Sequence, residues 1–409
     1  MPGPGFYWIG EEEEKEVIDV IRSRHLNRYG SADDPDFLAK TVTFEKTVRE
    51  RFGAPYSLAV ASGSAALIVA LNALRIGPGD EVIVPGYTFI ASISSVIFAG
   101  AVPVLAEVDE SLNLDPDDVE QRITPRTKAI MAVHMLGNPA KIDRLLEIAK
   151  RHNLLVIEDT AQAFGARFKG QYLGTYGDIG TYSFNIYKTI NAGDGGLIVT
   201  KDEETFKTAF AYHDQGHMPL RMGLEIGKRS VIGFNFRMNE LTAAVLLAQF
   251  RKLDELLGDL HRIKSRLKSR LQTIPGLGFR EITDEEGECG TLLVMLLPDE
   301  EIAGKVATDL GSKTISESGW HVYSNMEQIL SKRQLTPGPP FQSTEFPTDV
   351  EYKKGMLPKT DSLLKRAVNL SIGVVDPGLG SGFGLHPKAT ESEIDETAER
   401  LMSVLKRYV

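Results

Sequence analysis

Residues 154–196 read LLVIEDTAQAFGARFKGQYLGTYGDIGTYSFNIYKTINAGDGG, and this stretch predicts how the rest of the chain folds. Its first part, residues 154–157, is a short apolar run that leads into Asp159. Its second part, residues 179–187, is another strand-like run that leads into Lys188 and a glycine-rich turn. Short apolar runs are typical of buried parallel strands, and open α/β sheets bind ligands at the carboxyl ends of such strands. We therefore expect Asp159 and Lys188 to lie at the same edge of one sheet.

Two interpretations of this pair are open at this point. An amine at the ligand-binding edge of a sheet can form a Schiff base with a carbonyl compound, and a carboxylate there can hold a protonated pyridine nitrogen. The simpler interpretation is a surface salt bridge between the ends of two loops, which would carry no chemistry. The residues at the neighbouring strand ends decide between the two.

The overall composition is that of an ordinary globular protein. Of the 409 residues, 42% are hydrophobic and 25% are charged, and the length favours two domains. The net charge of −10 and a pI of about 5.4 do not indicate a nucleic-acid partner. No apolar stretch is long enough to span a bilayer, and the first residues do not resemble a secretory signal. Cys289 is the single cysteine, so we expect no internal disulfide and a cytoplasmic location.

From residue 56 onward, strand-like segments alternate with helical ones, which is the pattern of βαβ units around a largely parallel sheet. The expected strands are residues 57–61, 81–85, 102–108, 128–133, 154–159, 179–187 and 196–200. The expected helices between and after them are residues 64–74, 91–99, 115–122, 141–152 and 203–212.

The two ends of the chain have different patterns. The predicted helices there are residues 11–23, 44–52, 239–258, 260–271, 301–310 and 391–408, and a further strand is expected at 291–297. Residues 334–348 and 376–387 are rich in glycine and proline and are expected to form loops. We predict an N-terminal arm over residues 1–30, a large domain over 31–255 and a smaller domain over 256–409.

The segment ASGSAAL at residues 61–67 follows one predicted strand and opens one predicted helix. A helix N-terminus offers free backbone N–H groups and the positive end of the helix dipole, so it can bind an anion. Gly63 allows such a ligand to approach closely, and the hydroxyl of Ser64 can add a donor. The simpler interpretation is an ordinary N-cap.

Three more residues lie within reach of the same edge. Phe89, in the segment PGYTF after the next strand, can stack on a flat ring or pack in the core. Gln162 follows Asp159 by three residues, and Ser183 precedes Lys188 by five. Together with the candidate anion site at residues 61–67, these residues suit a heteroaromatic aldehyde that carries a phosphate group. Pyridoxal phosphate has these features.

Several stretches resemble the DegT/DnrJ/EryC1/StrS family of sugar aminotransferases. They are SGSAAL, GPGDEVIVPGYTF, AGAVPV, ITPRTKAIMAVHMLGNPA, VIEDTAQAFGA, GDIGTYSFNIYK and GFNFRMNE, in that order. The resemblance implies an α/β, fold-type-I pyridoxal-phosphate enzyme. Its large domain would contain a mostly parallel seven-stranded sheet, and its smaller C-terminal domain would be α+β. It also implies a homodimer with shared active sites at the subunit interface.

The resemblance also implies individual roles near the ring of the cofactor. Lys188 matches the Schiff-base lysine, and Asp159 matches the partner of the ring nitrogen. Phe89 matches the aromatic residue that stacks on the ring. Gln162 matches the residue near the phenolic oxygen. With these roles, Lys188 would also move the proton during transamination.

Four further positions match residues that bind the cofactor phosphate. Gly63, Ser64 and Ser183 match the phosphate loop of the same subunit. Asn235, in GFNFRMNE, matches the asparagine that reaches the phosphate of the neighbouring subunit's cofactor. The resemblance thus implies a phosphate site built from two chains.

Within the family, the sequence is most similar to the branch that includes 8-amino-3,8-dideoxy-octulosonate transaminase. The shared segments are HLNRYG at 25–30, HMLGNPA at 134–140 and HDQGH at 213–217. The family acts mostly on nucleotide-linked keto sugars, with glutamate or glutamine as the amino donor. The resemblance therefore implies an acceptor with a keto or aldehyde group on a sugar or a sugar-like metabolite.

Three departures from the family pattern keep alternatives open. The turn at residues 190–196 reads INAGDGG where the family commonly has a TTGEGG type of turn, and the tail at 370–390 is unusually rich in glycine. SGS replaces the commoner SGT, which keeps the hydroxyl group. Another pyridoxal-phosphate reaction, such as decarboxylation, dehydration or oxidation in natural-product biosynthesis, therefore stays open. A regulator that kept the fold without activity is the second alternative.

Four other residues are candidates for contacts with the substrate. His213 and His217 have the i, i+4 spacing of zinc ligands on a helix, but Gly216 lies between them and no third ligand is evident. We therefore expect no metal site there and predict a role in a substrate loop. His321 and Tyr323, in GWHVYSN, fall where family members often place substrate contacts.

Overall fold

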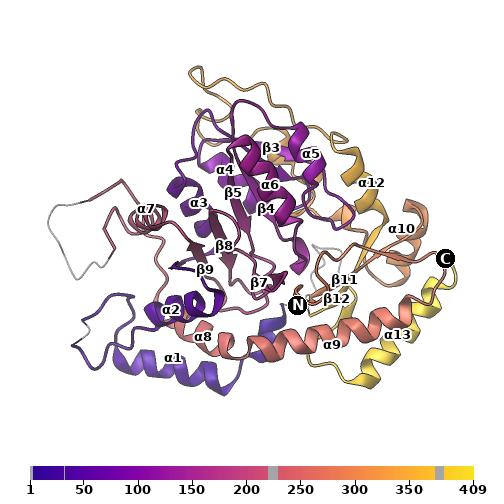
Figure 1. The fold of residues 1–409 in the computed structure, drawn as a ribbon. Coiled ribbons are helices and arrows are strands. Elements are labelled where there is room, and N and C mark those ends of the chain that lie inside the picture. Colours follow the sequence, from indigo (N-terminus) through magenta and orange to yellow (C-terminus); the bar gives the residue numbers. More distant parts are fainter. Residues whose placement is uncertain (1–2, 32, 220–228, 374–381) are drawn as a thin grey trace.

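A seven-stranded sheet with the order β1-β9-β8-β5-β4-β2-β3 forms the centre of the protein (Figure 1). The structure is a computed structural model, and it describes residues 3–31, 33–219, 229–373 and 382–409. Its strands are β1 (Tyr56–Val60), β2 (Glu81–Pro85), β3 (Val102–Ala106), β4 (Thr127–Val133), β5 (Leu155–Asp159), β8 (Ile179–Ser183) and β9 (Gly196–Thr200). Strand β9 is antiparallel to both of its neighbours, whereas the other adjacent pairs are parallel. The prediction of a largely parallel sheet is confirmed.

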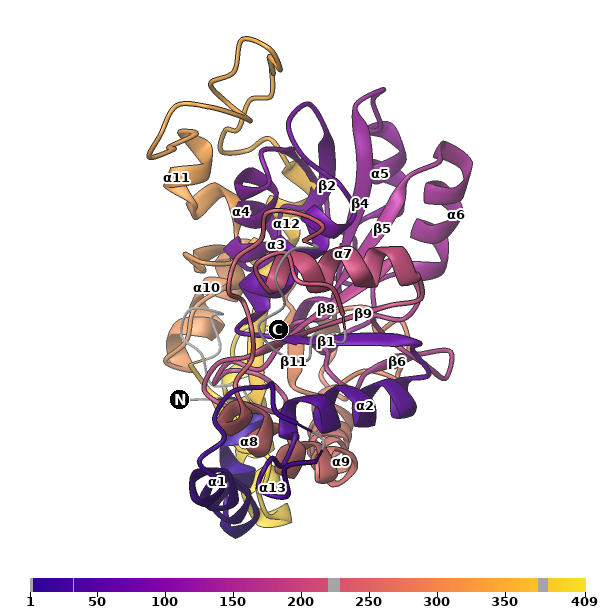
Figure 2. The same cartoon turned by 90° about the vertical axis from the view of Figure 1, so that its left-hand side faces the viewer.

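Helices cover both faces of this sheet (Figure 2). One face packs against α3 (Gly63–Ala73), α4 (Ile90–Phe98) and α7 (Glu203–His213), and the other against α2 (Lys40–Phe52), α5 (Pro116–Gln121), α6 (Ile142–His152) and α8 (Glu240–Arg251). In β2, Val82 and Val84 point to the first face and Ile83 to the second. Burial on both faces explains why these strands read as continuous apolar runs.

Several predicted elements are wrong in their bounds, and the helix predicted over 44–52 begins at Lys40. Strand β8 ends at Ser183, because the next residues form turns in which the N–H of Lys188 donates to the carbonyl of Asn185 at 3.0 Å. The helix predicted over 239–258 ends at Arg251, and α9 (Leu253–Leu271) begins after Lys252. The Lys252 ammonium binds Glu13 of α1 (Glu11–Ser23), and no glycine or proline marks this junction in the sequence.

A second sheet, with the order β10-β11-β12-β13, lies in the C-terminal part. Its strands are β10 (Gly278–Phe279), β11 (Leu292–Leu296), β12 (Ala367–Ile372) and β13 (Gly384–Leu385), and it packs with α9, α10 (Glu300–Asp309) and α13 (Glu391–Leu405) around a separate core. Strand β12 and helix α12 (Pro358–Arg366) were not predicted. The predicted domain boundary at residue 256 falls inside α9, and the division into three parts stays a prediction. Of the glycine-rich tail, residues 374–381 lie outside the described residues.

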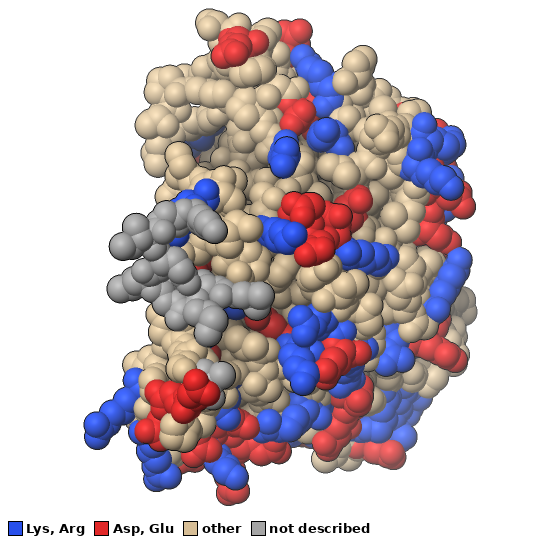
Figure 3. Space-filling model, turned by 60° about the vertical axis from the view of Figure 1, so that its left-hand side comes forward, with Lys and Arg blue, Asp and Glu red and all other residues tan. Residues whose placement is uncertain are grey.

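The remaining elements are short. They are the hairpin β6 (Arg167–Phe168) and β7 (Gln171–Tyr172), helix α11 (Glu327–Leu330), and the 3-10 turns Pro4–Trp8, Met135–Gly137, Ile315–Glu317 and Tyr323–Asn325. Within the described residues, no helix has the length and apolar character required to cross a membrane. On the described surface in Figure 3, acidic and basic side chains are interspersed, so this face has no continuous basic strip.

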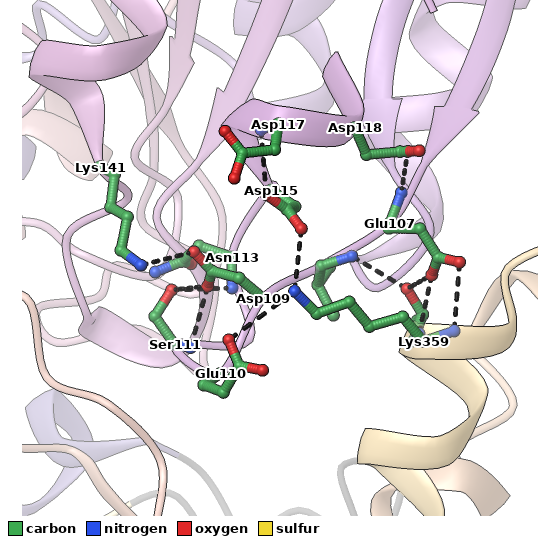
Figure 4. A network of polar contacts seen from close by, with 12 residues as sticks. Glu107, Asp109, Glu110, Ser111, Asn113, Asp115, Asp117, Asp118, Lys141 and Lys359 are labelled. Atoms are coloured by element: carbon green, nitrogen blue, oxygen red, sulfur yellow. Dashed lines mark hydrogen bonds and ion pairs between the residues drawn. The ribbon is translucent and has the colours of Figure 1, made fainter. Parts of the chain in front are cut away.

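A polar network joins α12 to the end of β3 (Figure 4). The carboxylate of Glu107 accepts the backbone N–H groups of Lys359 at 3.1 Å and Thr360 at 2.7 Å, together with the Thr360 hydroxyl at 2.6 Å. The Lys359 ammonium in turn binds Asp115 at 2.9 Å. A carboxylate at a helix N-terminus satisfies unpaired N–H groups and interacts favourably with the helix dipole. This contact fastens part of the C-terminal half to the large sheet.

Candidate active site

A cavity of about 600 Å³ opens at the carboxyl edge of the large sheet. Residues from the loops that follow β1, β2, β5 and β8 line it, as does the segment 320–321 from the C-terminal half. Its wall contains most of the residues singled out in the sequence: Gly63, Ser64, Phe89, Asp159, Gln162, Ser183, Lys188 and His321. The sheet topology has thus placed side chains from distant parts of the chain around one space.

The segment at the start of α3 forms a cup in the cavity wall. Ser62, not Ser64, caps the helix, because its hydroxyl accepts the N–H of Ala65 at 3.1 Å. This leaves the N–H groups of Gly63 and Ser64 without a hydrogen-bond partner among the described residues. A Cβ on Gly63 would lie 2.6 Å from the Cβ of Ser183, so only glycine lets the two loops approach this closely. The cup can therefore bind an anion, and the residue that acts as an ordinary N-cap is Ser62, directly before Gly63.

The two acidic residues at the end of β5 face opposite ways, as alternation along a strand requires. Glu158 is fully buried behind the site, where its carboxylate accepts N–H groups of Gly174, Tyr176 and Gly177 at 2.7–2.8 Å. Asp159 lines the cavity but is only 4% exposed. It is therefore placed to meet a buried ligand and is not part of a surface salt bridge.

Lys188 is half-buried in the turn after β8, and the N-terminal segment packs against this turn. The N–H of Gly3 donates to the carbonyl of Ile186 at 2.9 Å, and the N–H of Gly5 donates to that of Lys188 at 3.5 Å. A Cβ on Gly3 would lie 2.3 Å from the carbonyl carbon of Tyr187, so this close approach requires glycine. The N-terminal segment thus supports the backbone that carries the lysine.

Gln162 binds the loop that follows β4, and Arg280 from the C-terminal half of the chain holds this loop in place. Its Oε1 atom accepts the N–H of Leu136 at 2.9 Å, which leaves its NH₂ group as the end available to a ligand. Leu136 has a positive φ of 55°, and its carbonyl accepts a hydrogen bond from the buried Arg280 at 2.9 Å. The guanidinium group of Arg280 also binds the carbonyl of Met135 at 3.1 Å. Arg280 therefore stabilises the strained turn that orients Gln162.

The aromatic side of the cavity is built by pairing between two remote segments. The N–H of Thr88 donates to the carbonyl of His321 at 2.9 Å, and the N–H of Ile90 donates to that of Trp320 at 3.0 Å. The rings of Phe89 and His321 are 5.4 Å apart between centroids. Phe89 is 40% exposed, so it is not a core residue and its face is accessible from the cavity.

Three residues predicted as substrate contacts, Tyr323, His213 and His217, are not among the residues that line the cavity. Tyr323 is fully buried, and its hydroxyl donates to Asp361 at 3.0 Å. His213 is also fully buried, donates from Nδ1 to the carbonyl of Phe210, and faces the Arg28 guanidinium with Nε2 at 3.2 Å. Burial, reinforced by Arg28, lowers the pKa of His213 to about 3, so its ring is neutral. Both ring nitrogens are engaged, which leaves none for a metal ion.

His217 and Asn235 lie together with two of the three motifs shared with the finer branch, residues 25–30 and 213–217, outside the cavity lining, whereas the third motif, residues 134–140, contributes Leu136 to the cavity wall. His217 donates from Nδ1 to the carbonyl of Asp214 at 2.7 Å. The buried carboxylate of Asp214 accepts the hydroxyl of Tyr29 at 2.6 Å and binds the guanidinium of Arg237. Asn235 pairs with Asp214 through the backbone, and its side chain lies on the surface. Asn235 is therefore exposed and is not among the residues that line the cavity of its own chain.

Sequence reasoning missed several residues of the cavity wall. They are Ser62, Thr88, Asn185, Tyr187, Asp194, Thr291 and Trp320. Asp194 belongs to the turn that departs from the family pattern, so that departure was a signal for it. Trp320 precedes a predicted residue directly, and the exposed fraction of 58% shows that its ring is not core.

The sequence of residues 8–375 matches the DegT/DnrJ/EryC1/StrS aminotransferase family. The chain belongs to this family. Among curated relatives, GDP-perosamine synthase of Caulobacter vibrioides is 44% identical over 56% of this chain and 61% of its own length. GDP-perosamine synthase of Escherichia coli O157:H7 is 40% identical over 56% of this chain and 63% of its own. These alignments therefore span less than two thirds of the relatives' lengths.

Longer alignments support the same assignment. Spore coat polysaccharide biosynthesis protein SpsC of Bacillus subtilis is 29% identical over 97% of this chain and 95% of its own. Among solved structures, 3-amino-5-hydroxybenzoic acid synthase has a TM-score of 0.80 at 28% identity, covering 98% of this chain and 97% of that one. An aminotransferase from Psychrobacter cryohalolentis has a TM-score of 0.79 at 28% identity, covering 100% and 99%. The family member described here thus has the predicted fold-type-I architecture.

The residues present fit pyridoxal phosphate. The cup supplies unpaired N–H groups and hydroxyls for a phosphate, and its shape depends on the absence of a side chain at Gly63. Asp159 and Lys188 supply a carboxylate and an amine in the same cavity, and Phe89 supplies a flat face. A ligand with a phosphate, a basic ring nitrogen and an aldehyde would find a partner for each group.

The variant Gly63→Ala is expected to bind pyridoxal phosphate about tenfold more weakly, because the new Cβ would displace Ser183 and cost at least one hydrogen bond to a charged group, ~1.5–3 kcal/mol. Affinity can be measured by adding the cofactor to apo-protein and following fluorescence quenching of Trp320 in the cavity wall. Gly304→Ala, in α10 with no atom within 4 Å of the added Cβ, is the matched control. Unchanged affinity in Gly63→Ala would show that the cup does not hold the phosphate.

Proposed function

We propose that this protein is a pyridoxal-phosphate-dependent aminotransferase that moves an amino group from an amino-acid donor to a keto or aldehyde group of a sugar-like acceptor. The observation that carries the proposal is the shared cavity of Lys188, Asp159 and the phosphate cup. Family membership and the names of the relatives support it.

In this proposal Gly63, Ser64 and Ser183 would hold the phosphate, Asp159 the ring nitrogen and Lys188 the aldehyde end. Bound pyridoxal phosphate supplies a carbonyl that takes up an amino group and a ring that withdraws electrons from the adjacent carbon. The Nζ atom of Lys188 would be the general base that takes the proton from the α-carbon of the donor.

The burial of Asp159 contributes to the same step. Its carboxylate is only 4% exposed, so a positive charge on a ring nitrogen beside it would be attracted more strongly than in water. This attraction favours the protonated nitrogen, which is the electron-withdrawing form of the ring. The NH₂ group of Gln162 would donate to an oxygen of the bound cofactor.

The donor and the acceptor are proposed from the family. We propose glutamate or glutamine as the amino donor, in line with a relative named L-glutamine:2-deoxy-scyllo-inosose aminotransferase, from Streptomyces kanamyceticus. The acceptor is proposed to be a keto sugar or a related cyclic ketone. His321, which lines the cavity beside Phe89, is the proposed contact with this substrate.

The direct test is a single half-reaction. Purified protein loaded with pyridoxal phosphate is mixed with glutamate, and 2-oxoglutarate is measured together with the loss of the cofactor's visible absorbance. One equivalent of 2-oxoglutarate per site is expected. Carbon dioxide release or no reaction with glutamate and glutamine alike would favour the alternative of a different pyridoxal-phosphate reaction, which the turn at 190–196 keeps open. If the protein bound no pyridoxal phosphate, the result would favour the alternative of a regulator that kept the fold without activity.

We further propose that the active form is a homodimer with shared active sites. The segment that presents Asn235 also exposes large apolar side chains, with Ile232 91% exposed and Phe234 59%. Adjacent exposed apolar residues are typical of a surface that a partner covers. A second copy would cover them and would bring Asn235 to the phosphate of its neighbour, as the family resemblance implies.

Asn235→Ala is therefore expected to weaken cofactor affinity by roughly one to two orders of magnitude, the loss of one hydrogen bond to a charged group. Mixing an inactive Lys188→Ala chain with an inactive Asn235→Asp chain tests the shared site directly. Mixed dimers have one site with both changes and one with neither, so part of the activity should return. No recovery, with subunit exchange demonstrated by mass spectrometry, would contradict the interface position of Asn235.

We propose that the protein is related to the 8-amino-3,8-dideoxy-octulosonate transaminase branch, because it shares three short segments with it. We also propose a cytoplasmic location, because the chain has a single cysteine. We propose no nucleic-acid or membrane partner. The contacts of Tyr323, His213 and His217 described above give them structural roles, so we leave them out of the proposed substrate site.

A further inference from the structure

Asp159 is the end of a short chain of buried hydroxyl groups. Its Oδ2 atom accepts a hydrogen bond from Ser92 Oγ at 2.7 Å, and Ser92 Oγ lies 2.7 Å from Thr88 Oγ1. The exposed fraction is 1% for Ser92 and 0% for Thr88. Ser92 lies in α4 and Thr88 in the turn before it, so this turn and α4 together bring the two hydroxyl groups to the end of β5.

The direction of these hydrogen bonds follows from the chemistry of the groups. An ionised carboxylate can only accept, so Ser92 must use its single proton on Asp159. Thr88 must then donate its proton to Ser92. Hydroxyl groups linked in this way polarise one another, so the bond to the carboxylate is stronger than that from an isolated serine.

We propose that Ser92 and Thr88 are positioning residues that fix the carboxylate of Asp159 for the ring nitrogen of the cofactor, an inference that rests on the proposed function. The backbone N–H of Ala161 holds Oδ1 at 3.1 Å while Ser92 holds Oδ2, so both oxygens are fixed and the carboxylate plane cannot rotate freely. Hydrogen bonds to the charged form also stabilise it in a buried place, where an unsolvated charge is costly.

The same turn connects Asp159 to the substrate side of the cavity. Thr88 and Ile90 donate backbone hydrogen bonds to His321 and Trp320, both of which line the cavity. A displacement of residues 320–321 would therefore move Thr88, and through Ser92 it would change the support of Asp159. The two hydroxyl groups thus connect Asp159 to the part of the cavity wall formed by residues 320–321, where the acceptor is proposed to bind.

The test compares Ser92→Ala, Ser92→Thr and Thr88→Val with Ser95→Ala as the matched control. Ser95 lies one turn further along α4, is 2% exposed, and donates only to the carbonyl of Ser92 at 3.3 Å. The readouts are the affinity of apo-protein for pyridoxal phosphate, the pH dependence of the bound cofactor's absorbance, and the rate of the glutamate half-reaction. Thermal unfolding of each variant shows whether it is folded.

Ser92→Ala is expected to bind the cofactor about tenfold more weakly and to shift the pH dependence of its absorbance. Ser92→Thr, which keeps the hydroxyl, should restore both, and Thr88→Val should show a smaller effect of about threefold. In the Asp159→Asn protein, Ser92→Ala should weaken cofactor binding by a smaller factor than it does in the unchanged protein, because the hydroxyl acts through the carboxylate.

Two outcomes separate this inference from the proposed function. If Ser92→Ala and Thr88→Val match Ser95→Ala in all three readouts while Asp159→Asn is impaired, the positioning role is overturned and the proposed function stands. A fully additive loss in the double variant would also overturn it. If Asp159→Asn itself matches the unchanged protein, the proposed function fails first.

Discussion

Lys188→Ala is expected to abolish turnover, with a loss of at least about a thousandfold, because both the attachment of the cofactor and proton transfer at the substrate carbon are assigned to this amine. Lys188 is the only lysine among the described residues that line the cavity, so no neighbouring amine can replace it. The variant should still bind pyridoxal phosphate through the cup, since Gly63, Ser64 and Ser183 are unchanged. Its absorbance should be that of the free aldehyde.

The matched control for this variant is Lys201→Ala. Lys201 follows β9 on the surface, where its ammonium lies 3.4 Å from the carbonyl of Tyr176, at the opposite edge of the same sheet. Its removal changes the net charge by the same amount and should leave turnover unchanged. Retained conversion of glutamate to 2-oxoglutarate by Lys188→Ala, at a rate within tenfold of the unchanged protein, would refute the assignment of the lysine.

Much of this site could be predicted from the sequence because its main residues sit where one element ends and another begins. Asp159 closes an apolar run and Gly63 opens a helix, and both positions follow from local periodicity and from the rule that ligands bind at the carboxyl ends of parallel strands. Lys188 lies at the predicted edge of the sheet, although the strand before it ends at Ser183 and not at residue 187 as predicted. The error did not matter, since the turn after Ser183 stays at the same edge.

The supporting residues could not be predicted in this way. Ser92 is one of several small residues inside an apolar helix, and nothing in the pattern distinguishes it from Ser95, whose hydroxyl donates to the carbonyl of Ser92 instead. Trp320 reaches the cavity only because its carbonyl accepts the N–H of Ile90, a contact between segments far apart in the chain. Such pairings depend on tertiary packing, which periodicity in one sequence does not encode.

The same limit applies to two of the predicted substrate contacts. His213 lies in HDQGH and Tyr323 in GWHVYSN, and both are fully buried with polar atoms engaged by other parts of the chain. Asp214, between the two predicted histidines, collects contacts from Tyr29 and Arg237 instead. A shared motif can therefore mark a structural network as readily as a substrate site.

Asp159→Asn is expected to lower the rate of the glutamate half-reaction by about a hundredfold or more, the scale seen when a preorganised electrostatic contact is removed from an active site. The amide is nearly the same size, and its oxygen can still accept the hydrogen bond from Ser92 at the position of Oδ2. It carries no negative charge, however, so it cannot favour a protonated ring nitrogen. Cofactor affinity should fall much less than the rate, because the phosphate cup is untouched.

This difference between rate and affinity is what separates an electrostatic role from a structural one. A residue that only shaped the cavity would lower affinity and rate together when changed. Asp178→Asn is the matched control, since its carboxylate accepts the N–H of Val156 at 2.7 Å near the other end of the same sheet and leaves the cavity intact. Half-reaction rates from stopped-flow absorbance, measured beside cofactor affinities, give the comparison. A near-normal rate in Asp159→Asn would show that the ring nitrogen does not depend on this charge.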